Sequence, residues 1–350
     1  MDKMAKKVSI LIISKNAENT IKRLMDSIFA QTYPGIEIVC VDSSDDGTKG
    51  ILEEYKRFSK FPFKLMFQEP KGCGAARNEA FRNASGDITT VLDSDDYIPA
   101  DYIEKLVQPF NEKNNIVGVY VNGMIVSSAK NLFSEFVKLY EDITLFRDEV
   151  FYDKPHKYLI ATIREVGAAA GEYDENAEVA EDLIHAKGVN EVLKEFTTKG
   201  YTFESVDTCF ISERQAHTFT DHWKKCMWYA KALVYKNYIR NYKKDSIIKI
   251  GASTYITTLP FMLLILFSFG ANAFVYGVIV MPLLLTMIYL DHKAFRKGIV
   301  TWKLFLLPFY IYYRAFFTFA GILYELTIKI YAVLTTRERK SSHFRKLFNK

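Results

Sequence analysis

Four consecutive residues in the amino-terminal half, Asp93-Ser94-Asp95-Asp96, carry three carboxylates. Carboxylates this close repel one another unless a cation lies between them. Mg²⁺ or Mn²⁺ would relieve the repulsion, because these ions bind one or two carboxylates together with substrate phosphates. The alternative is a solvated, aspartate-rich turn that caps a helix predicted over Pro99–Phe110. The tetrapeptide alone leaves both interpretations open.

The segments that must position these carboxylates alternate between strand and helix patterns. Continuous apolar runs rich in β-branched residues predict strands buried on both faces. Between them, apolar residues at helical spacing and glycine-containing breaks indicate helices. The predicted strands are Val8–Ser14, Ile36–Val41, Phe63–Phe67 and Ile88–Leu92, and the predicted helices are Asn19–Gln31, one ending near Ser59, and Gly72–Ala84. This order predicts an α/β fold with a mostly parallel, open, Rossmann-like sheet and helices on both faces.

Polar residues fall at the carboxyl ends of three predicted strands, where ligands bind in open parallel sheets. They are Ser14, Asp42 and the aspartate cluster, and we expect them to face one crevice. A dinucleotide site is disfavoured, because the loop after the first strand lacks glycine and Gly72-Cys73-Gly74 continues to Arg77 instead of a third glycine. The sequence also lacks a Gly-Lys-Ser/Thr phosphate-binding loop. Dehydrogenase and nucleoside triphosphatase chemistry are therefore disfavoured.

Four stretches, taken in order, resemble the family-two, GT-A-fold inverting glycosyltransferases over roughly residues 7–230. They are VSILIISKNAENTIKRLMDSIFAQTYPGIEIVCVDSSDDGT, GCGAARNEAF, ASGDITTVLDSDDYIPADYIEKLV and GEYDENAEVAEDLIHAKGV. The resemblance implies a GT-A catalytic domain, a nucleotide-sugar donor, and Mn²⁺ or Mg²⁺ on an Asp-x-Asp motif.

The resemblance also implies roles for residues at the strand ends. Asp42 would meet the base of the nucleotide, and Ser14 would lie on the same donor side. Asp93 would lie near the ribose or the sugar, and Asp95 would ligate the metal on the diphosphate. Arg77, in the Ala-Arg-Asn stretch, would lie beside the donor; its alternative is an ordinary arginine on a helix surface.

Glu181-Asp182 resembles the Glu-Asp pair of the same family, so Asp182 is the expected catalytic base and Glu181 its neighbour. The alternative is an acidic helix start after Asn176. Inversion needs a single displacement, in which a base removes the proton of the acceptor. A hydroxyl keeps its proton at neutral pH and benefits from such a base, whereas a lipid phosphate is already ionised. The pair therefore favours a hydroxyl acceptor over a polyprenyl phosphate.

The sequence departs from the family after the last strand of the catalytic domain, predicted near Asp207–Ile211. Many relatives have a metal-binding His there, but here Glu213 follows, and His217 and His222 come later. Glu213 is a candidate replacement ligand, or the metal has fewer protein ligands. The Gln-x-x-Arg-Trp motif of processive enzymes is matched only at Trp228, which argues against a polymerising synthase.

The carboxyl-terminal part is basic and strongly apolar. Residues 222–350 contain 20 Lys and Arg against 4 Asp and Glu, and Ile250–Leu290 contains no charged residue. A membrane-spanning helix needs about 20 apolar residues, so two spans are predicted near Ile250–Phe269 and Ala273–Leu290. Basic flanks on both sides place both ends of this hairpin in the cytoplasm. A hairpin in a soluble core is the alternative.

Two further segments have membrane-surface character. The apolar stretch Ile299–Leu334 is interrupted by charges and precedes the basic tail 335–350, so an interfacial or re-entrant helix, or a broken hairpin, is favoured over a third crossing. Trp223–Lys244 alternates aromatics with lysines, which predicts an amphipathic helix in the headgroup region or, alternatively, an ordinary domain helix. Residues 111–170 give little signal beyond an amphipathic, acceptor-side helix suggested over Lys130–Phe151.

The predicted organisation is a catalytic domain over 1–221, an interfacial helix over 222–246, membrane-associated helices over 247–334 and the tail. The first apolar run is short and followed by Lys15, which indicates a strand rather than a signal peptide. The four cysteines lack the spacing of a zinc site or a disulfide scaffold. The catalytic domain is therefore expected in the cytoplasm, on a multi-pass protein of the cell membrane.

The predicted activity is transfer of a sugar from a UDP- or GDP-sugar to a hydroxyl of a lipid-linked glycan by a membrane-anchored inverting glycosyltransferase. One alternative is a polyprenyl-phosphate glycosyltransferase. An alternative of another class is a non-catalytic membrane scaffold that binds nucleotide sugars. No nucleic-acid partner is expected, because the basic half is also the apolar and aromatic half, which is typical of a membrane surface.

Overall fold

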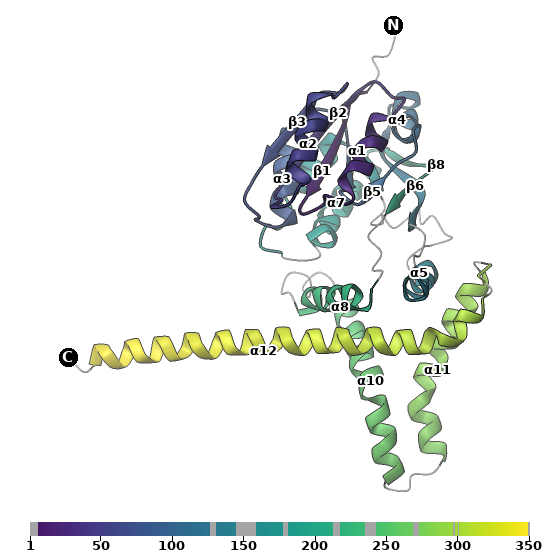
Figure 1. Ribbon diagram of the computed structural model, residues 1–350, viewed down its shortest axis with the longest axis vertical. Coiled ribbons are helices and arrows are strands. Elements are labelled where there is room, and N and C mark those ends of the chain that lie inside the picture. The colour runs from purple at the N-terminus through teal and green to yellow at the C-terminus, as the bar shows by residue number, and fades with distance from the viewer. Residues whose placement is uncertain are drawn as a thin grey trace. The chain divides into compact units, whose positions relative to one another are not determined.

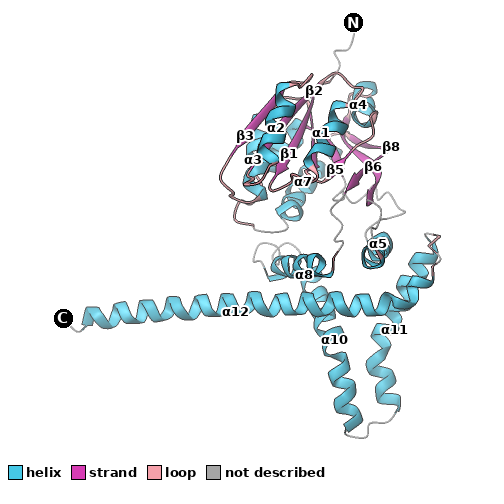
Figure 2. Ribbon diagram, in the orientation of Figure 1, coloured by secondary structure: helices cyan, strands magenta, loops and turns pink. Residues whose placement is uncertain are grey.

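The structure is a computed structural model that describes residues 6–126, 131–144, 159–177, 181–212, 218–234, 243–268, 273–296, 298–299 and 301–348. It divides into two units. The first consists of Met1–Lys130 and Leu145–Gln215, and the second of Asn131–Thr144 and Ala216–Lys350. The first unit combines strands and helices, whereas the described part of the second is helical (Figure 2).

Strands and helices alternate through the first unit (Figure 1). The strands are β1 (Val8–Ser14), β2 (Ile36–Asp42), β3 (Phe63–Phe67), β4 (Ile88–Asp93), β5 (Asp96–Tyr97), β6 (Ile116–Val126), β7 (Leu159–Ile163) and β8 (Thr202–Ser212). The helices are α1 (Ile21–Phe29), α2 (Thr48–Arg57), α3 (Cys73–Asn83), α4 (Tyr102–Glu112), α6 (Arg164–Ala170) and α7 (Glu181–Thr198). The predicted strands and helices of the first hundred residues are present, with ends that differ by a few residues.

The described strands form one eight-stranded sheet in the order β3-β2-β1-β4-β7-β6-β8-β5. The first four are parallel neighbours, as the alternating pattern predicted, and β6 and β8 are also parallel. The pairings of β7 with β4 and β6, and of β5 with β8, are antiparallel. The predicted open α/β sheet is therefore confirmed, with a mixed second half that the sequence did not reveal.

The apolar residues of β1 alternate between two separate cores. Ile10 and Ile12 pack on one face, in the cluster that also contains the buried residues of α1 and α4. Leu11 and Ile13 pack on the other face with Ala76 and Ala80 of α3 and with Ala84, which follows the helix. Successive side chains of a strand point to opposite faces, so a continuous apolar run is what a strand covered on both sides requires.

The second unit is built from long helices. They are α5 (Leu132–Thr144), α8 (Phe219–Val234), α10 (Lys243–Ser268), α11 (Ala273–Arg296) and α12 (Leu307–Phe348), with a 3₁₀ turn at Trp302–Leu306 before the last. Within the expected stretches Lys130–Phe151 and Trp223–Lys244, helix is found over the bounds of α5 and α8. Residues 145–151 and 235–242 lie outside the described residues.

Two helices in the described part of the chain are long and apolar enough to cross a membrane: Ile247–Ser268, within α10, and Trp302–Tyr331, which includes the start of α12. The first contains most of the first predicted span. The second predicted span lies in α11, beside α10 (Figure 1), and is not one of these two. The third apolar stretch was expected to be interfacial, re-entrant or a broken hairpin. Because α12 is continuous from Leu307 to Phe348, the broken hairpin is wrong.

A buried histidine joins helices of the second unit. His222 of α8 is 5% exposed, and its Nε2 lies 2.8 Å from the Tyr310 hydroxyl of α12. Burial, and then the charges of Arg314 and Lys225, lower the pKa of His222 to about 3. A neutral imidazole can pack among aromatic side chains, so His222 has a structural role in the core of this unit.

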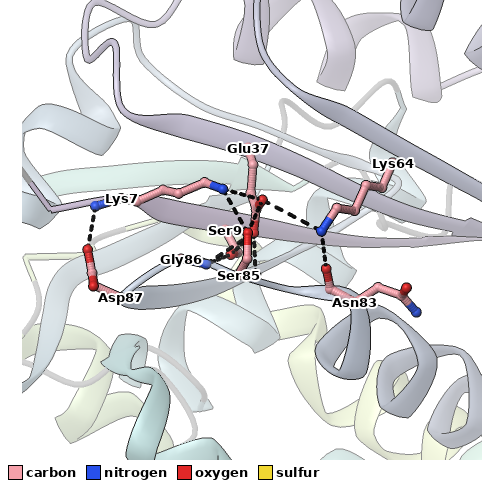
Figure 3. A network of polar contacts seen from close by, with 8 residues as sticks. All are labelled: Lys7, Ser9, Glu37, Lys64, Asn83, Ser85, Gly86 and Asp87. Carbon is pink, nitrogen blue, oxygen red and sulfur yellow. Dashed lines mark hydrogen bonds and ion pairs between the residues drawn. The ribbon is translucent and has the colours of Figure 1, made fainter.

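A buried carboxylate joins the amino-terminal ends of β1, β2 and β4 (Figure 3). Glu37 of β2 pairs in register with Ser9 of β1, and its side chain is 1% exposed. Ser9 Oγ and the Ser85 amide donate to Glu37 Oε1, and the Gly86 amide donates to the same oxygen at 3.1 Å. Ser85 Oγ and Lys7 Nζ each lie 2.7 Å from Oε2. A Cβ on Gly86 would lie 2.6 Å from the Ser9 nitrogen, so only glycine allows this approach.

The donors around Glu37 determine its ionisation. Burial by itself raises the pKa of a carboxyl, but hydrogen bonds from Lys7, Ser9 and Ser85 lower the pKa of Glu37 from 4.5 to about 2. The folded-state pKa is thus below the unfolded value. Ionised Glu37 therefore stabilises the fold above about pH 4.5, and this contribution is lost as the pH falls from 4.5 towards 2.

Replacing Glu37→Gln should lower the opening free energy of β1 and β2 by roughly 2–3 kcal/mol at pH 7, because a charged acceptor of several hydrogen bonds is removed. The deficit should shrink between pH 4.5 and pH 2, where the wild-type protein loses the same contribution. Hydrogen exchange of peptides from both strands, corrected for intrinsic rates, measures this. Glu53→Gln, an exposed glutamate on α2, is the matched control. An equal deficit at pH 7 and pH 2.5 would contradict the assignment.

Candidate active site

The strand register brings three predicted donor-side residues to one edge of the sheet. Ser14 pairs with Asp42 across β1 and β2, and Ile13 pairs with Asp93 across β1 and β4. Because these three strands are parallel neighbours, their carboxyl ends lie together. The predicted convergence of Ser14, Asp42 and Asp93 on one edge is therefore present in the structure.

Asp42 is held by hydroxyl groups and is 1% exposed. Ser14 Oγ and Ser44 Oγ each donate to Asp42 Oδ1 at 2.6 Å. Its other oxygen, Oδ2, receives only a long contact of 3.3 Å from the Ser44 amide among the hydrogen bonds of the described residues. The carboxylate is thus fixed in orientation by one oxygen, and the second oxygen keeps capacity to accept a further hydrogen bond.

The loops after β1 and β2 are tied to each other. The Asn16 amide donates to Ser44 Oγ at 2.8 Å, and the Asp45 amide donates to Asn16 Oδ1 at 3.0 Å. Asn16 has a φ of 52°, in the left-handed region that asparagine tolerates better than most residues. This loop–loop contact was not predicted, although an asparagine directly after a strand end was a usable signal.

The aspartate cluster forms the turn between β4 and β5. Asp96 is 5% exposed, and its Oδ2 accepts a hydrogen bond of 3.0 Å from the Asp93 amide. Burial, and then the carboxylates of Asp93 and Asp95, raise the pKa of Asp96 to about 7. Asp93 keeps 41% of its side chain exposed, and Asp95 is half-buried. The cluster is therefore one buried, readily protonated acid with two accessible carboxylates beside it.

The donor chemistry of this turn fits a hard divalent cation that is completed by substrate. In the part of the chain that the structure describes, no group of three or more His, Cys, Asp or Glu side chains is placed to hold a metal ion. Mg²⁺ commonly uses only one or two carboxylates together with substrate phosphates. Asp93 and Asp95 belong to the same turn as the buried Asp96, and their carboxylates add to the effect of burial in raising the pKa of Asp96. Glu213, the expected further ligand, lies outside the described residues.

Arg77 of α3 connects two of the predicted acidic residues. Its Nη1 donates to Glu181 Oε1 in a short ion pair, and its Nη2 lies 3.4 Å from Asp93 Oδ1. The Arg77 side chain is 13% exposed, so it is not the ordinary surface arginine of the alternative interpretation. Burial would lower the pKa of Arg77, but the carboxylates of Asp93 and Glu181 raise it above its ordinary value.

The two acids at the start of α7 have different surroundings. The Glu181 side chain is 7% exposed and faces Arg77, whereas Asp182 is exposed. Both belong to the first helical turn, as the alternative of an acidic helix start also required. An acidic helix start alone would not connect these acids to the carboxylate at the end of β4. Such a connection is present, because Arg77 contacts both Glu181 and Asp93.

Three residues that were not singled out from the sequence complete this cluster. The Tyr173 ring stacks on His185 with centroids 3.8 Å apart, and the Arg77 guanidinium carbon lies 5.6 Å from the centroid of the same ring. Asn78 Oδ1 accepts from the Tyr173 amide at 2.7 Å, and Asn78 Nδ2 donates to the Tyr173 carbonyl at 3.1 Å. The spacing of four residues from Glu181 to His185 was a signal, because such positions share a helix face.

Comparison with known proteins identifies the part of the chain that contains β1 to β4, Arg77 and Asn78, whereas Tyr173, Glu181 and His185 follow the matched segment. Residues 9–163 match the family described as Glycosyl transferase family 2. The UDP-Glc:alpha-D-GlcNAc-diphosphoundecaprenol beta-1,3-glucosyltransferase WfgD of Escherichia coli is 39% identical over 132 residues, which cover 37% of this chain and 50% of that protein. The putative glycosyltransferase EpsH of Bacillus subtilis is 32% identical over 136 residues, 39% of each chain. The matched stretches span half or less of these curated relatives.

A solved structure shares the fold over a longer stretch. The mannosyltransferase PcManGT from Pyrobaculum calidifontis, in complex with GDP-Man and Mn²⁺, superimposes with a TM-score of 0.52 at 18% identity, covering 89% of this chain and 86% of that one. At this identity the likeness concerns the fold. The matched segment, residues 9–163, contains β1 to β4 and Arg77, so this part of the chain is a glycosyl transferase family 2 domain; the fold is of the GT-A type.

Proposed function

We propose that the chain is a membrane-anchored inverting glycosyltransferase that moves a sugar from a UDP- or GDP-sugar to a hydroxyl of a lipid-linked glycan. The observation that carries the proposal is the contact of one buried arginine, Arg77, with both Asp93 and Glu181. It joins the donor edge of a family 2 domain to the turn that holds Asp182. The name of WfgD, which states a UDP-glucose donor and a diphosphoundecaprenol-linked acceptor, supports the substrate class.

On the donor side, the edge formed by Ser14, Asp42 and Asp93 is suited to a nucleotide. Asp42 Oδ2 is the oxygen that would accept an N–H of the base, because Oδ1 already accepts two hydroxyl hydrogen bonds. The leaving nucleoside diphosphate gains negative charge as the bond to the sugar breaks. Arg77 supplies a fixed positive charge nearby, and a pre-oriented charge of this kind lowers the barrier to such a step.

Asp95, with Asp93 beside it, would hold Mn²⁺ or Mg²⁺, which when bound offsets charge on the diphosphate as a Lewis acid. The two carboxylates are the accessible members of the aspartate turn. Without a counter-charge, the same carboxylates would repel the diphosphate. The chain's own residues therefore bind the donor well only when that negative charge is balanced.

On the acceptor side, Asp182 is the proposed general base. It is exposed at the first turn of α7, next to the buried Glu181. Its carboxylate would take the proton from the acceptor hydroxyl as the oxygen attacks the anomeric carbon and the nucleoside diphosphate departs from the opposite face. One displacement with the base and the leaving group on opposite faces inverts the anomeric centre.

Membrane attachment is supported by the surface of α10 and α11. Large apolar side chains on both helices are more than half exposed, and they include Phe261, Leu264, Ile265, Leu285 and Ile288. Soluble proteins seldom expose contiguous apolar surface of this kind. A bilayer that covers this hairpin would bring the enzyme to a lipid-linked acceptor by diffusion in two dimensions.

Two rival functions remain distinguishable by experiment. A polyprenyl-phosphate glycosyltransferase would share the donor edge but would not depend on a base, because its acceptor is already ionised. A non-catalytic scaffold would bind a nucleotide sugar without releasing nucleoside diphosphate.

Replacing Asp182→Asn should reduce turnover on diphosphoundecaprenol-linked GlcNAc roughly 10²- to 10⁴-fold, because the base that accepts the hydroxyl proton is removed. The affinity for nucleoside diphosphate should stay unchanged. Release of nucleoside diphosphate and isothermal titration measure the two quantities. Glu191→Gln, an exposed acid on the same helix, is the control. Full activity of the Asn variant on undecaprenyl phosphate would favour the polyprenyl-phosphate enzyme.

Removing divalent cations with EDTA should abolish nucleoside diphosphate release from the active member of a panel of UDP- and GDP-sugars, and Mn²⁺ or Mg²⁺ should restore it. Asp95→Asn should raise the Mn²⁺ concentration required for half-maximal activity about tenfold or more, since a charged oxygen ligand is lost. Asp101→Asn, an exposed acid at the start of α4, should have no such effect. Turnover that is indifferent to EDTA would contradict this site, and donor binding without any turnover would support the scaffold.

Introducing Leu264→Arg together with Leu285→Arg should release the protein from membranes washed at alkaline pH. An arginine costs about 2.5–3.5 kcal/mol of insertion free energy at the centre of a spanning helix, and less towards the ends. Leu264 and Leu285 lie between the centre and the carboxyl-terminal end of the predicted spans Ile250–Phe269 and Ala273–Leu290. Immunoblotting of pellet and supernatant measures the distribution. Leu132→Arg, an exposed leucine on α5, is the matched control. If the double variant remains in the pellet, as the wild type and Leu132→Arg should, the hairpin is not the anchor.

A further inference from the structure

We propose that Glu181 is a positioning residue: its ion pair with Arg77 fixes the first turn of α7, so that Asp182 presents its carboxylate to the acceptor. Arg77 is then the connection between the base-bearing turn and the strand-end carboxylate Asp93. This inference rests on the proposed function, because it takes Asp182 as the base. It assigns the two adjacent acids different tasks.

Burial separates the two acids. Glu181 is 7% exposed and its carboxylate binds a guanidinium that is itself 13% exposed, whereas Asp182 is exposed. Replacing Glu181 by a neutral side chain would leave the largely buried Arg77 charge without its closest partner, and breaking such an ion pair is costly. Neighbouring positions of an α-helix differ by about 100° in direction, since a turn has 3.6 residues. With Glu181 turned to Arg77, Asp182 must face elsewhere.

A second contact fixes α7 one turn further on. His185 stacks on Tyr173 with an interplanar angle of 10°, and its Nε2 lies 2.9 Å from the Gly171 carbonyl oxygen. Because Glu181 and His185 are four residues apart, they lie on one face of the helix. Two anchors on one face, one turn apart, set the rotation of the helix about its axis.

The loop that receives His185 is in turn fixed to α3. Asn78, which follows Arg77, binds the Tyr173 backbone through both its amide oxygen and its amide nitrogen. A Cβ on Gly74 would lie 2.8 Å from the Asp174 carbonyl oxygen, so α3 and this loop are in close contact. Among the described residues, α3 thus contacts the first turn of α7 directly through Arg77 and is connected to it indirectly through Asn78.

Arg77 has unequal partners. It forms a hydrogen-bonded ion pair with Glu181, whose side chain is 7% exposed, and a contact of 3.4 Å with Asp93, whose side chain is 41% exposed. The firm contact is therefore with α7, and the weaker contact is with the donor edge. Loss of Glu181 should release α7 without removing the donor edge, so it should affect turnover more than donor affinity.

The kinetic test compares Glu181→Gln, Arg77→Gln and the double variant with the wild type and with Glu191→Gln as control. Glu181→Gln should lower kcat about 10- to 100-fold, the size of effect that a small misplacement of a catalytic group causes. The dissociation constant for nucleoside diphosphate should change less than threefold. The double variant should be no slower than the slower single variant, because both changes break one ion pair. Independent, multiplicative losses would overturn the proposal.

The pH profile distinguishes positioning from catalysis. If Asp182 is the base, kcat should fall at low pH as that base becomes protonated, which gives the pH profile an acidic limb. If Glu181 only positions Asp182, this limb should persist in Glu181→Gln and vanish in Asp182→Asn. Loss of the limb in Glu181→Gln would make Glu181 itself the base and overturn the proposal.

Should Glu181→Gln fold poorly, as judged by its melting temperature, His185→Phe tests the second anchor. It keeps a stacked ring and loses the Gly171 contact, and it should lower kcat with the limb retained; unchanged kcat would count against the proposal.

A thiol beside the ion pair gives a readout that needs no turnover. Cys73 lies at the start of α3, and the pKa of its thiol is raised above the ordinary value. Partial burial of the thiol is the largest cause, the Glu181 carboxylate raises the pKa further, and the charge of Arg77 opposes both. Alkylation of Cys73 at fixed pH should therefore become faster in Glu181→Gln and slower in Arg77→Gln, with Cys73→Ser identifying the signal. No change in either variant would show that the pair does not form.

These readouts separate the failure of this inference from that of the proposed function. If Asp182→Asn keeps full activity on a hydroxyl acceptor, the proposed function fails, whatever Cys73 reports. If Asp182→Asn loses activity as expected while Glu181→Gln leaves kcat and Cys73 alkylation unchanged, the proposed function stands and the positioning role fails.

Discussion

The parallel register of β2, β1 and β4 is the constraint on which the site depends. It sets Ser14 against Asp42 and Ile13 against Asp93, so the residues predicted to bind the donor meet at one edge. At the opposite end of the same strands, Glu37 accepts hydrogen bonds from the residues before and within β1 and before β4. A slip of one residue would turn every side chain of a strand to the other face. By holding the register, the buried Glu37 carboxylate therefore also keeps Ser14, Asp42 and Asp93 in place at the other end of the strands.

The sequence allowed the parallel half of the sheet to be predicted, because buried strands and amphipathic helices leave strong local patterns. It gave the strand-end residues as well, since chain direction alone decides which end of a strand carries them. The antiparallel half was not predictable in this way. β5 has two residues, and its pairing with β8 depends on a partner more than a hundred positions away. The contacts of Arg77 with Glu181, and of Tyr173 with His185, likewise arise from the path of the chain and not from spacing.

The carboxyl-terminal part shows how a local pattern can mislead. The proline and the charges in the third apolar stretch made a broken hairpin one of the expected structures, besides an interfacial or re-entrant helix, but α12 is continuous. Pro308 lies in the first turn of the helix, where a missing amide hydrogen costs little. Arg314 is accommodated 4.5 Å above the Tyr140 ring, and Glu325 lies 3.9 Å from Lys231. Tertiary partners on α5 and α8 thus accept the charges that a bare sequence treats as interruptions.

Glu181 and Asp182 illustrate the limit of residue type as a guide to chemistry. They are adjacent carboxylates in one helical turn, and the sequence offers no means to rank them beyond resemblance. The structure separates them by surroundings: one carboxylate is buried against a guanidinium, and the other is exposed. A carboxylate buried against a guanidinium is a rigid attachment point, whereas an exposed carboxylate beside it can be reached by a ligand. If Asp182 is the base, as proposed, two neighbouring residues divide between them a fixed attachment to α3 and a carboxylate open to an acceptor.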